Sequence, residues 1–121
     1  MAVVDLSKHK GKTPAQHWED NAVEGCHVPM AFPAALKFAD ATVEDQVTAI
    51  FSEARELAEA LHEQDPMWLV ELLDVHHSIE TLYRILANTY GPDVLNNARA
   101  RVIQKNAERG YYLDADDHKP A

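Results

Sequence analysis

The sequence contains a single cysteine, Cys26, so no disulfide can form within the chain. A lone thiol is typical of proteins from a reducing compartment. No apolar run approaches the roughly 20 residues that a membrane-spanning helix needs. The N-terminal stretch MAVVDLSKHKGKT also lacks the long apolar segment of a signal peptide. These absences predict a cytoplasmic protein without a membrane partner.

Basic residues are scarce as well. The chain has 11 Lys and Arg against 20 Asp and Glu, which gives a formal net charge of −9. This balance excludes broad, nonspecific nucleic-acid binding, because such binding depends on a surplus of positive charge. We therefore predict no nucleic-acid partner. An acidic protein still binds polyanions when a divalent cation bridges the two, or when its few basic residues cluster.

Glycine is rare, with four in 121 residues, and the sequence has no strand pattern, internal repeat or low-complexity tract. Ala, Leu and Glu dominate the middle of the chain, as they do in helical proteins. The length fits one domain spanning residues 1–121. We predict a single all-α domain.

The first 40 residues carry weaker signals. Residues 1–12 are basic and hold little to bury, which predicts a mobile N-terminal arm. A short helix is predicted over 14–22, since Pro14 is tolerated at a first helical position. The segment 24–33, EGCHVPMAFP, is apolar but interrupted by prolines. We expect a packed loop there, with Met30, Ala31 and Phe32 plugging the helices.

Three strong helices are predicted after residue 42. The first covers 43–62, where apolar residues recur at steps of three and four behind a Thr42 cap. The second runs from Asp65-Pro66 to Tyr90, and the third covers 92–109. Short loops between them predict an antiparallel helical bundle. Its core would be thin, which predicts completion by a homo-oligomer, a dimer or a tetramer.

Two carboxylates interrupt the second helix within the stretch ELLDVHHSIE, residues 71–80. Glu71 and Asp74 border the same side of an apolar stripe. That stripe consists of Leu72, Val75, Ile79, Leu82 and Leu86. Such carboxylates pair with Lys or Arg, stay hydrated or bind a cation, because desolvating an unpaired charge is costly. His77 and Glu80 point away from the stripe and are predicted to be solvated.

The first helix offers further acids in SEARELAEAL, residues 52–61. Glu53 flanks the apolar stripe of its helix, Glu56 lies farther round, and Glu59 is nearly opposite. An acid pair at i, i+3 on each of two antiparallel neighbours brings four carboxylates together. They repel one another unless cations bind, and oxygen ligands of this kind suit Mg²⁺ or Mn²⁺. The alternative is a solvated acidic face.

The third helix ends in basic residues. Val94, Ala98 and Val102 define its expected inward stripe, and the same line leads to Lys105 and Arg109. Cations near a helix C-terminus are favoured by the helix dipole in any case. Inward-pointing Lys105 and Arg109, with Asn106 beside them, would be placed to hold phosphate oxygens.

These three segments together resemble the MazG-like, all-α nucleoside triphosphate pyrophosphohydrolases, over residues 43–112. That family carries E-E-x-x-E on one helix, E-x-x-D on the next and K-N-x-x-R-G at the end of a third. The resemblance implies that four acids bind Mg²⁺ and serve as catalytic carboxylates. These acids are Glu53, Glu56, Glu71 and Asp74. It also implies that Lys105, Asn106 and Arg109 contact the triphosphate or the sugar. Ser52 replaces the leading acid of the first motif, so metal affinity or the number of ions would differ.

The resemblance implies hydrolysis of an NTP to NMP and pyrophosphate. A relative specific for phosphoribosyl-ATP or for dUTP or dCTP is an alternative, as is a non-catalytic helical interaction module. Trp68, Tyr111 and Tyr112 are candidates for stacking on a base, although aromatic residues at helix ends more often pack in a core or an interface.

Two smaller groups are weaker candidates for a metal site. Cys26 and His27 are adjacent in sequence and project differently. His76 and His77 are expected to be one packed and one exposed histidine, not ligands.

Overall fold

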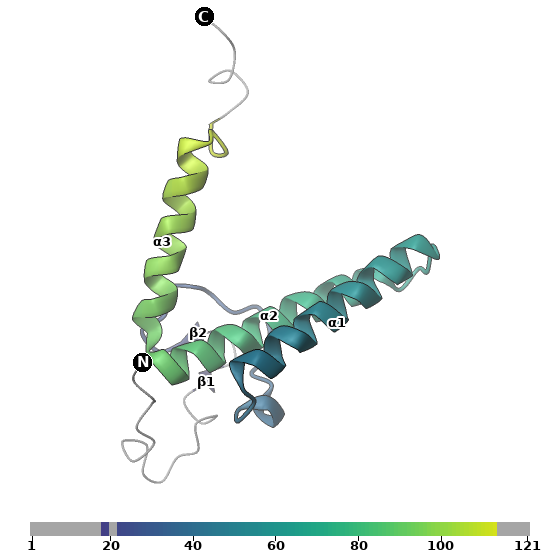
Figure 1. Ribbon diagram of the computed structural model, residues 1–121, viewed down its shortest axis with the longest axis horizontal. Helices are drawn as coiled ribbons and strands as arrows, with labels where there is room; N and C mark the ends of the chain where they lie inside the picture. The colour runs from purple at the N-terminus through teal and green to yellow at the C-terminus, as the bar shows by residue number, and fades with distance from the viewer. Residues whose placement is uncertain (1–17, 20–21, 114–121) are drawn as a thin grey trace, which may run out of the picture.

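The computed structural model describes residues 18–19 and 22–113, and its fold is all-α. Three helices dominate it: α1 (Val43–His62), α2 (Trp68–Tyr90) and α3 (Pro92–Glu108) (Figure 1). The predicted bounds agree with these, except that α2 begins three residues after Asp65. The Asp65 carboxylate instead accepts a hydrogen bond from Met67 N–H, at 2.9 Å, in the turn before the helix. No helix in the described ranges is both long and apolar enough to cross a membrane.

Two very short strands replace part of the predicted N-terminal helix. β1 (Trp18–Glu19) pairs antiparallel with β2 (Ala22–Val23), with Trp18 opposite Val23. The helix predicted over 14–22 is therefore wrong wherever the chain is described. Asp20 and Asn21 separate the strands in sequence, and residues of these types favour turns over helix interiors. The remainder of that segment and the predicted arm at 1–12 lie outside the described residues.

Helices α1 and α2 lie side by side and antiparallel (Figure 1). Thr42 caps α1 as predicted, since its Oγ1 accepts a hydrogen bond from Asp45 N–H at 3.0 Å. At the other end of α1, Gln64 adopts a positive φ of 57° in the tight turn to α2. Gln46 joins the two helices, because its buried side chain donates from Nε2 to Ser78 O at 2.9 Å. The antiparallel arrangement predicted for this pair is confirmed.

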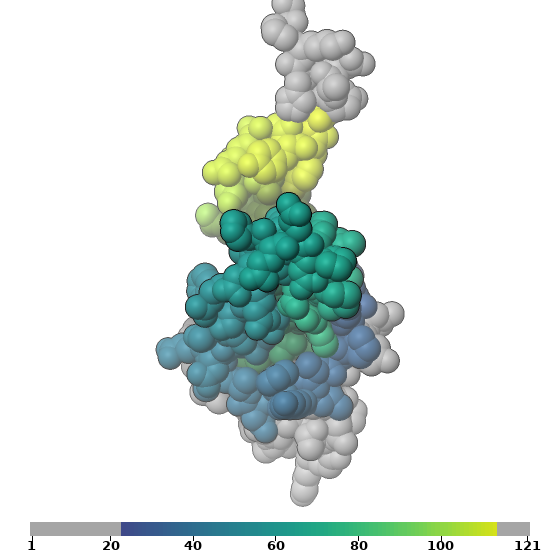
Figure 2. Space-filling view, turned by 90° about the vertical axis from the view of Figure 1, so that its right-hand side faces the viewer, coloured from purple at the N-terminus to yellow at the C-terminus, as the bar shows by residue number. Residues whose placement is uncertain are grey.

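Helix α3 leaves the pair at a wide angle instead of folding back along α2 (Figures 1 and 2). Only Gly91 separates α2 from α3, with φ 87° and ψ 157°. A single residue is too short to reverse the chain, since antiparallel helix hairpins use connections of about 2–5 residues. Antiparallel packing of α3 is therefore wrong for the single chain. Val94 and Val102, predicted to face inward, are 45% and 49% exposed.

The small hydrophobic core lies at the elbow between α2 and α3. It consists of Val23, Met30, Ala87 and Leu95, with half-buried Cys26, Tyr83 and Leu86 packed against it. Met30 is only 4% exposed, so the predicted plug by this loop is confirmed. We call residues 25–33 the strap, because they run along α2 and α3 outside the helices. Asn96 ties its first part down by accepting from His27 N–H and donating to Gly25 O.

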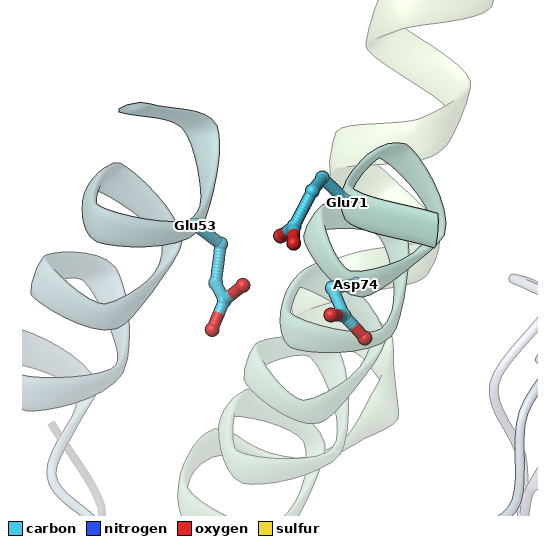
Figure 3. A group of neighbouring side chains, drawn as sticks. All are labelled: Glu53, Glu71 and Asp74. Carbon is cyan, nitrogen blue, oxygen red and sulfur yellow. The ribbon is translucent and has the colours of Figure 1, made fainter. Parts of the chain in front are cut away.

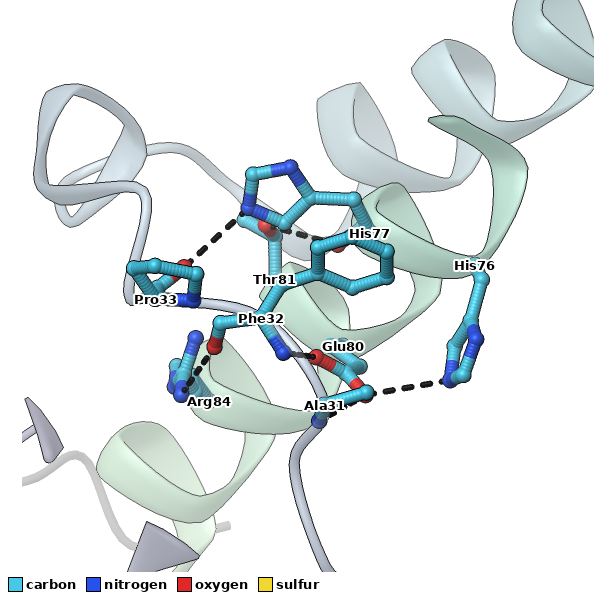
Figure 4. A network of polar contacts seen from close by, with 8 residues as sticks. All are labelled: Ala31, Phe32, Pro33, His76, His77, Glu80, Thr81 and Arg84. Carbon is cyan, nitrogen blue, oxygen red and sulfur yellow. Dashed lines mark hydrogen bonds and ion pairs between the residues drawn. The ribbon is translucent and has the colours of Figure 1, made fainter. Parts of the chain in front are cut away.

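Glu80 holds the second part of the strap (Figure 4). Its carboxylate accepts hydrogen bonds from Ala31 N–H at 2.7 Å and Phe32 N–H at 2.9 Å, and His76 Nε2 lies 3.0 Å from Oε2. Arg84 donates to Phe32 O at 3.1 Å. Glu80 is 1% exposed, so its predicted solvation is wrong. The strap contacts α2 although the two are about 50 residues apart in sequence. It buries a face of α2 that would otherwise be exposed to solvent.

Candidate metal centre

Three of the predicted carboxylates meet near the α1–α2 turn (Figure 3). Glu53 projects from α1 toward Glu71 and Asp74 on α2, and one oxygen from each lies within 4.8 Å of the others. Glu71 and Asp74 are three residues apart, which places them on neighbouring positions of one helix face. Glu53 and Glu71 are half-buried and Asp74 is exposed. We call Glu53, Glu71 and Asp74 the acid cluster.

The environment of the acid cluster favours the protonated form of Glu53. Partial burial is the largest cause that raises the pKa of the Glu53 carboxyl above its ordinary value of 4.5. The charge of Glu56 is the next cause, followed by the charge of Asp74. A hydrogen bond with Glu56 and the charge of Glu71 contribute less. Glu53 is thus held near negative charge from both helices.

Glu71 shows the same direction of shift. Loss of hydration is the first cause that raises its pKa above 4.5, and the charges of Glu56, Asp74 and Asp65 follow. Glu56, the fourth predicted ligand, therefore acts electrostatically on both Glu53 and Glu71, although it is exposed and not one of the three closest groups. The four acids predicted from the sequence are brought together, and Glu59 is not among them.

No cation from the described part of the chain neutralises the acid cluster. The ion pair found among those residues is His76–Glu80, and no Lys or Arg there lies within salt-bridge distance of Glu53, Glu71 or Asp74. The possibility that these acids pair with Lys or Arg thus finds no support in residues 18–19 and 22–113. A hydrated acidic face and a cation site both remain compatible with the geometry.

The donor set consists of carboxylate oxygens alone. Such hard ligands suit Mg²⁺ or Mn²⁺, and a protein usually supplies Mg²⁺ with a few carboxylates while water and substrate phosphates fill the other positions. The exposure of Asp74 leaves one side of the acid cluster open to solvent. A divalent cation held here would be able to activate water for attack on a phosphate ester or anhydride.

The predicted phosphate ligands lie elsewhere in the single chain. Lys105 and Arg109 are exposed and Asn106 is half-buried in the last turns of α3, whose C-terminal end points away from the α1–α2 turn (Figure 1). The expectation that Lys105 and Arg109 point inward is therefore wrong within one chain. The expectation fails because the backbone at Gly91 directs α3 away from the α1–α2 pair.

The aromatic candidates are divided between two places. Trp68 is half-buried at the start of α2, three residues before Glu71. Of the three aromatic candidates it is nearest in sequence to the acid cluster. Tyr111 and Tyr112 follow α3 and are 63% and 60% exposed. Ser52, in place of an acid, is half-buried beside Glu53 on α1.

His76 and His77 contact Phe32 of the strap, whereas His27 is exposed. The side chain of His76 is 49% exposed and His77 is half-buried, stacked on Phe32 at 5.0 Å between ring centroids. Cys26 packs against the core. Neither pair belongs to a group of three or more metal-ligating side chains in the described residues.

Glu80 is the polar residue that sequence reasoning misplaced. A signal was present, because Glu80 follows His76 by four residues and precedes Arg84 by four, so the three share one helix face. What the spacing could not show is the backbone of residues 31 and 32, which supplies two of the hydrogen bonds.

No protein-family model, curated protein or solved structure matches this chain.

Proposed function

We propose that this protein is a Mg²⁺-dependent nucleoside triphosphate pyrophosphohydrolase, which converts a (d)NTP to a (d)NMP and pyrophosphate. One observation supports it most directly: carboxylates from two helices converge within 4.8 Å without a basic partner among the described residues. The resemblance of the three acidic and basic segments to the MazG-like enzymes supplies the reaction type. We further propose a cytoplasmic homo-oligomer.

The acid cluster would hold the metal, with Glu56 beside it. Bound there, Mg²⁺ would supply an acidified water and neutralise charge on the leaving pyrophosphate. Loss of hydration and then neighbouring negative charge raise the pKa of Glu53 and of Glu71, and the second of these causes supports a cation as the missing partner. A carboxylate that is not a ligand would accept the proton of the attacking water.

The basic residues of α3 would bind the substrate. Arg109 is suited to hold a phosphate with two parallel hydrogen bonds, and Lys105 to hold it as a point charge. Asn106 would contact the sugar or the phosphate. Trp68, which precedes Glu71 on α2 by three residues, would be the candidate to stack on a base.

The test is pyrophosphate release from a panel of canonical and modified nucleotides with Mg²⁺ or Mn²⁺, including phosphoribosyl-ATP, dUTP and dCTP. We expect Asp74→Asn to lower the rate by about 100-fold or more, as loss of a catalytic group does. Glu59→Gln is the matched control, because Glu59 is an exposed acid on the same helix as Glu53, and it should retain the wild-type rate.

A non-catalytic interaction module is the second candidate. The observation that favours it is the set of exposed apolar side chains on α2 and α3, such as Leu73 at 50% and Val102 at 49%. Large exposed apolar surface marks interaction sites. If no nucleotide in the panel yields pyrophosphate with either metal, the enzymatic proposal is wrong and this one replaces it.

A further inference from the structure

Two apolar grooves run along the elbow and meet at Tyr83. One lies on α2 and is lined by Leu72, Leu73, Val75, Ile79 and Tyr83. The other lies between α2 and α3, and its mostly apolar lining includes Val28, Tyr83, Leu95, Val102 and Ile103, with Arg99 as the charged member. Because they share Tyr83, both arms of the elbow carry one continuous apolar strip.

Much of this strip is exposed, although Leu95 within it is buried. Leu72 is 41% exposed and Leu73 50% on α2, while Val102 is 49% exposed and Ile103 39% on α3. Leu72, Val75 and Ile79 of this groove belong to the stripe that the sequence predicted to be the inner face of α2. In the structure α1 packs instead against the side of α2 that carries Glu71, Asp74 and Ser78, which leaves Leu72 of the apolar stripe exposed and the rest of the stripe only half-buried.

The two arms also carry opposite charge. Residues 43–74, which form α1 and the first part of α2, hold nine Asp or Glu and one Arg. Residues 92–109, which form α3 and its last turn, hold four Lys or Arg and two Asp or Glu. A surface with an acidic arm and a basic arm is complementary to a second copy of itself when the arms are exchanged.

The arms match in length. Arg109 lies 17 residues beyond Pro92, and Asp74 lies 16 residues before Tyr90. At a rise of 1.5 Å per residue, both are about 25 Å from the elbow. A two-fold axis that bisects the elbow would lay α3 of each copy along α2 of the other. The basic end of α3 would then stop at the level of the acid cluster.

We propose that a second copy of this chain occupies the apolar strip in this way, so that Lys105 and Arg109 of one copy complete the site formed by Glu53, Glu71 and Asp74 of the other. The part played in catalysis rests on the proposed pyrophosphohydrolase function, whereas the dimer itself does not. This arrangement accounts for two findings together: the exposed apolar stripes, and the separation of the acids from the basic residues within one chain.

The first experiment measures the mass of the full chain in solution by light scattering during size exclusion. We expect twice the chain mass of 13.6 kDa, and the monomer mass for Val102→Glu. Leu61→Glu is the control and should remain dimeric, because Leu61 is 55% exposed at the end of α1, outside both grooves. A monomeric wild type at about 100 µM, or a Val102→Glu variant that stays dimeric, overturns the proposal.

The second experiment tests which helices meet. In a Cys26→Ser background, Ile79→Cys and Ile103→Cys are prepared as separate chains, mixed and oxidised. Both positions line the apolar strip and lie eleven residues from the elbow, so a cross-linked heterodimer should form. The matched mixture of Leu61→Cys with Ile103→Cys should give none. A dimer that forms without the 79–103 cross-link has another interface and contradicts the proposal.

The third experiment tests whether the site is shared. Asp74→Asn and Lys105→Ala, each inactive alone, are mixed and allowed to exchange subunits. If the site draws on both copies, half of the dimers are mixed and each has one intact site, which gives about a quarter of the wild-type rate. No recovery in a mixture shown to contain heterodimers refutes the shared site. If wild type itself has no activity, the proposed function is wrong, while mass and cross-linking still decide the dimer.

Discussion

The carboxylates of helix α2 have opposite environments in its middle and in its first two turns. Glu80, in the middle of the helix, is 1% exposed and is held by two backbone N–H groups and His76. Glu71 and Asp74, two turns earlier, lie beside Glu53 with no basic residue among the described ones in salt-bridge distance. One carboxylate is satisfied and fixes a loop, whereas the others are crowded with like charge. The buried carboxylate of Glu80 thus has a structural role. The candidate site is instead distinguished by carboxylates that lie close to one another without a neutralising partner among the described residues.

The largest effect should come from removing the satisfied carboxylate. Glu80→Ala removes the acceptor of the Ala31 and Phe32 N–H groups, and a hydrogen bond to a charged group contributes about 1.5–3 kcal/mol. We expect the free energy of unfolding to fall by about 3 kcal/mol, measured by urea denaturation. Glu59→Ala, an exposed acid on α1, should change it by less than about 0.5 kcal/mol. A similar small change for Glu80→Ala would mean that the strap is not anchored by this carboxylate.

A metal ion should relieve the crowded carboxylates. A ligand that binds only the native state stabilises it by about 1.4–2.7 kcal/mol at 10–100 times its Kd. We therefore expect Mg²⁺ to raise the melting temperature of the wild type and to have no such effect on Asp74→Asn. Matched NaCl at equal ionic strength is the control, since simple screening also weakens repulsion. Equal shifts with both salts would argue for a hydrated acidic face.

Removing one charge from the acid cluster should help the metal-free fold slightly. Asp74→Asn keeps the shape of the side chain and removes its repulsion on Glu53 and Glu71. We expect a gain of about 0.5 kcal/mol in the free energy of unfolding without metal, because exposed charges contribute little. A clear loss of stability would show instead that Asp74 takes part in a structural ion pair.

The pH dependence should be the smallest of these effects. Glu53 and Glu71 have folded-state pKa values above the ordinary 4.5, so the native state binds their protons more tightly than the unfolded chain does. Their contribution to stability is present below pH 4.5 and is lost as the pH rises through the folded pKa values. Glu71→Gln should flatten this slope in metal-free thermal melts above pH 4.5. An unchanged slope would contradict the raised pKa values.

Much of the site was predictable because it depends on local rules. Helix periodicity and caps defined α1 and α2, and a short turn forced them to be antiparallel. An i, i+3 acid pair on α2 facing Glu53 then follows from the geometry of two neighbouring helices. For this reason the sequence predicts the proximity of Glu53, Glu71 and Asp74.

The rest depends on contacts that no single helix contains. A helical wheel placed Glu80 in water, because it does not include residues 31 and 32 of the strap. It also placed Val102 and Lys105 inward, because periodicity defines a face of a helix but not what covers that face. The direction of α3 depends on the backbone torsion angles of Gly91. A hydrophobic pattern in the sequence does not predict such angles.

The one-residue connection at Gly91 has a consequence for how this fold changes. A Cβ at this position would meet no atom within 4 Å, but the backbone has a positive φ of 87°, where side chains other than glycine are strained. The junction is therefore constrained by torsion and length, not by packing. An insertion of a few residues there would allow α3 to turn back onto its own α2. For the dimer proposed above, chain length at this single hinge would distinguish a closed monomer from domain-swapped exchange between copies.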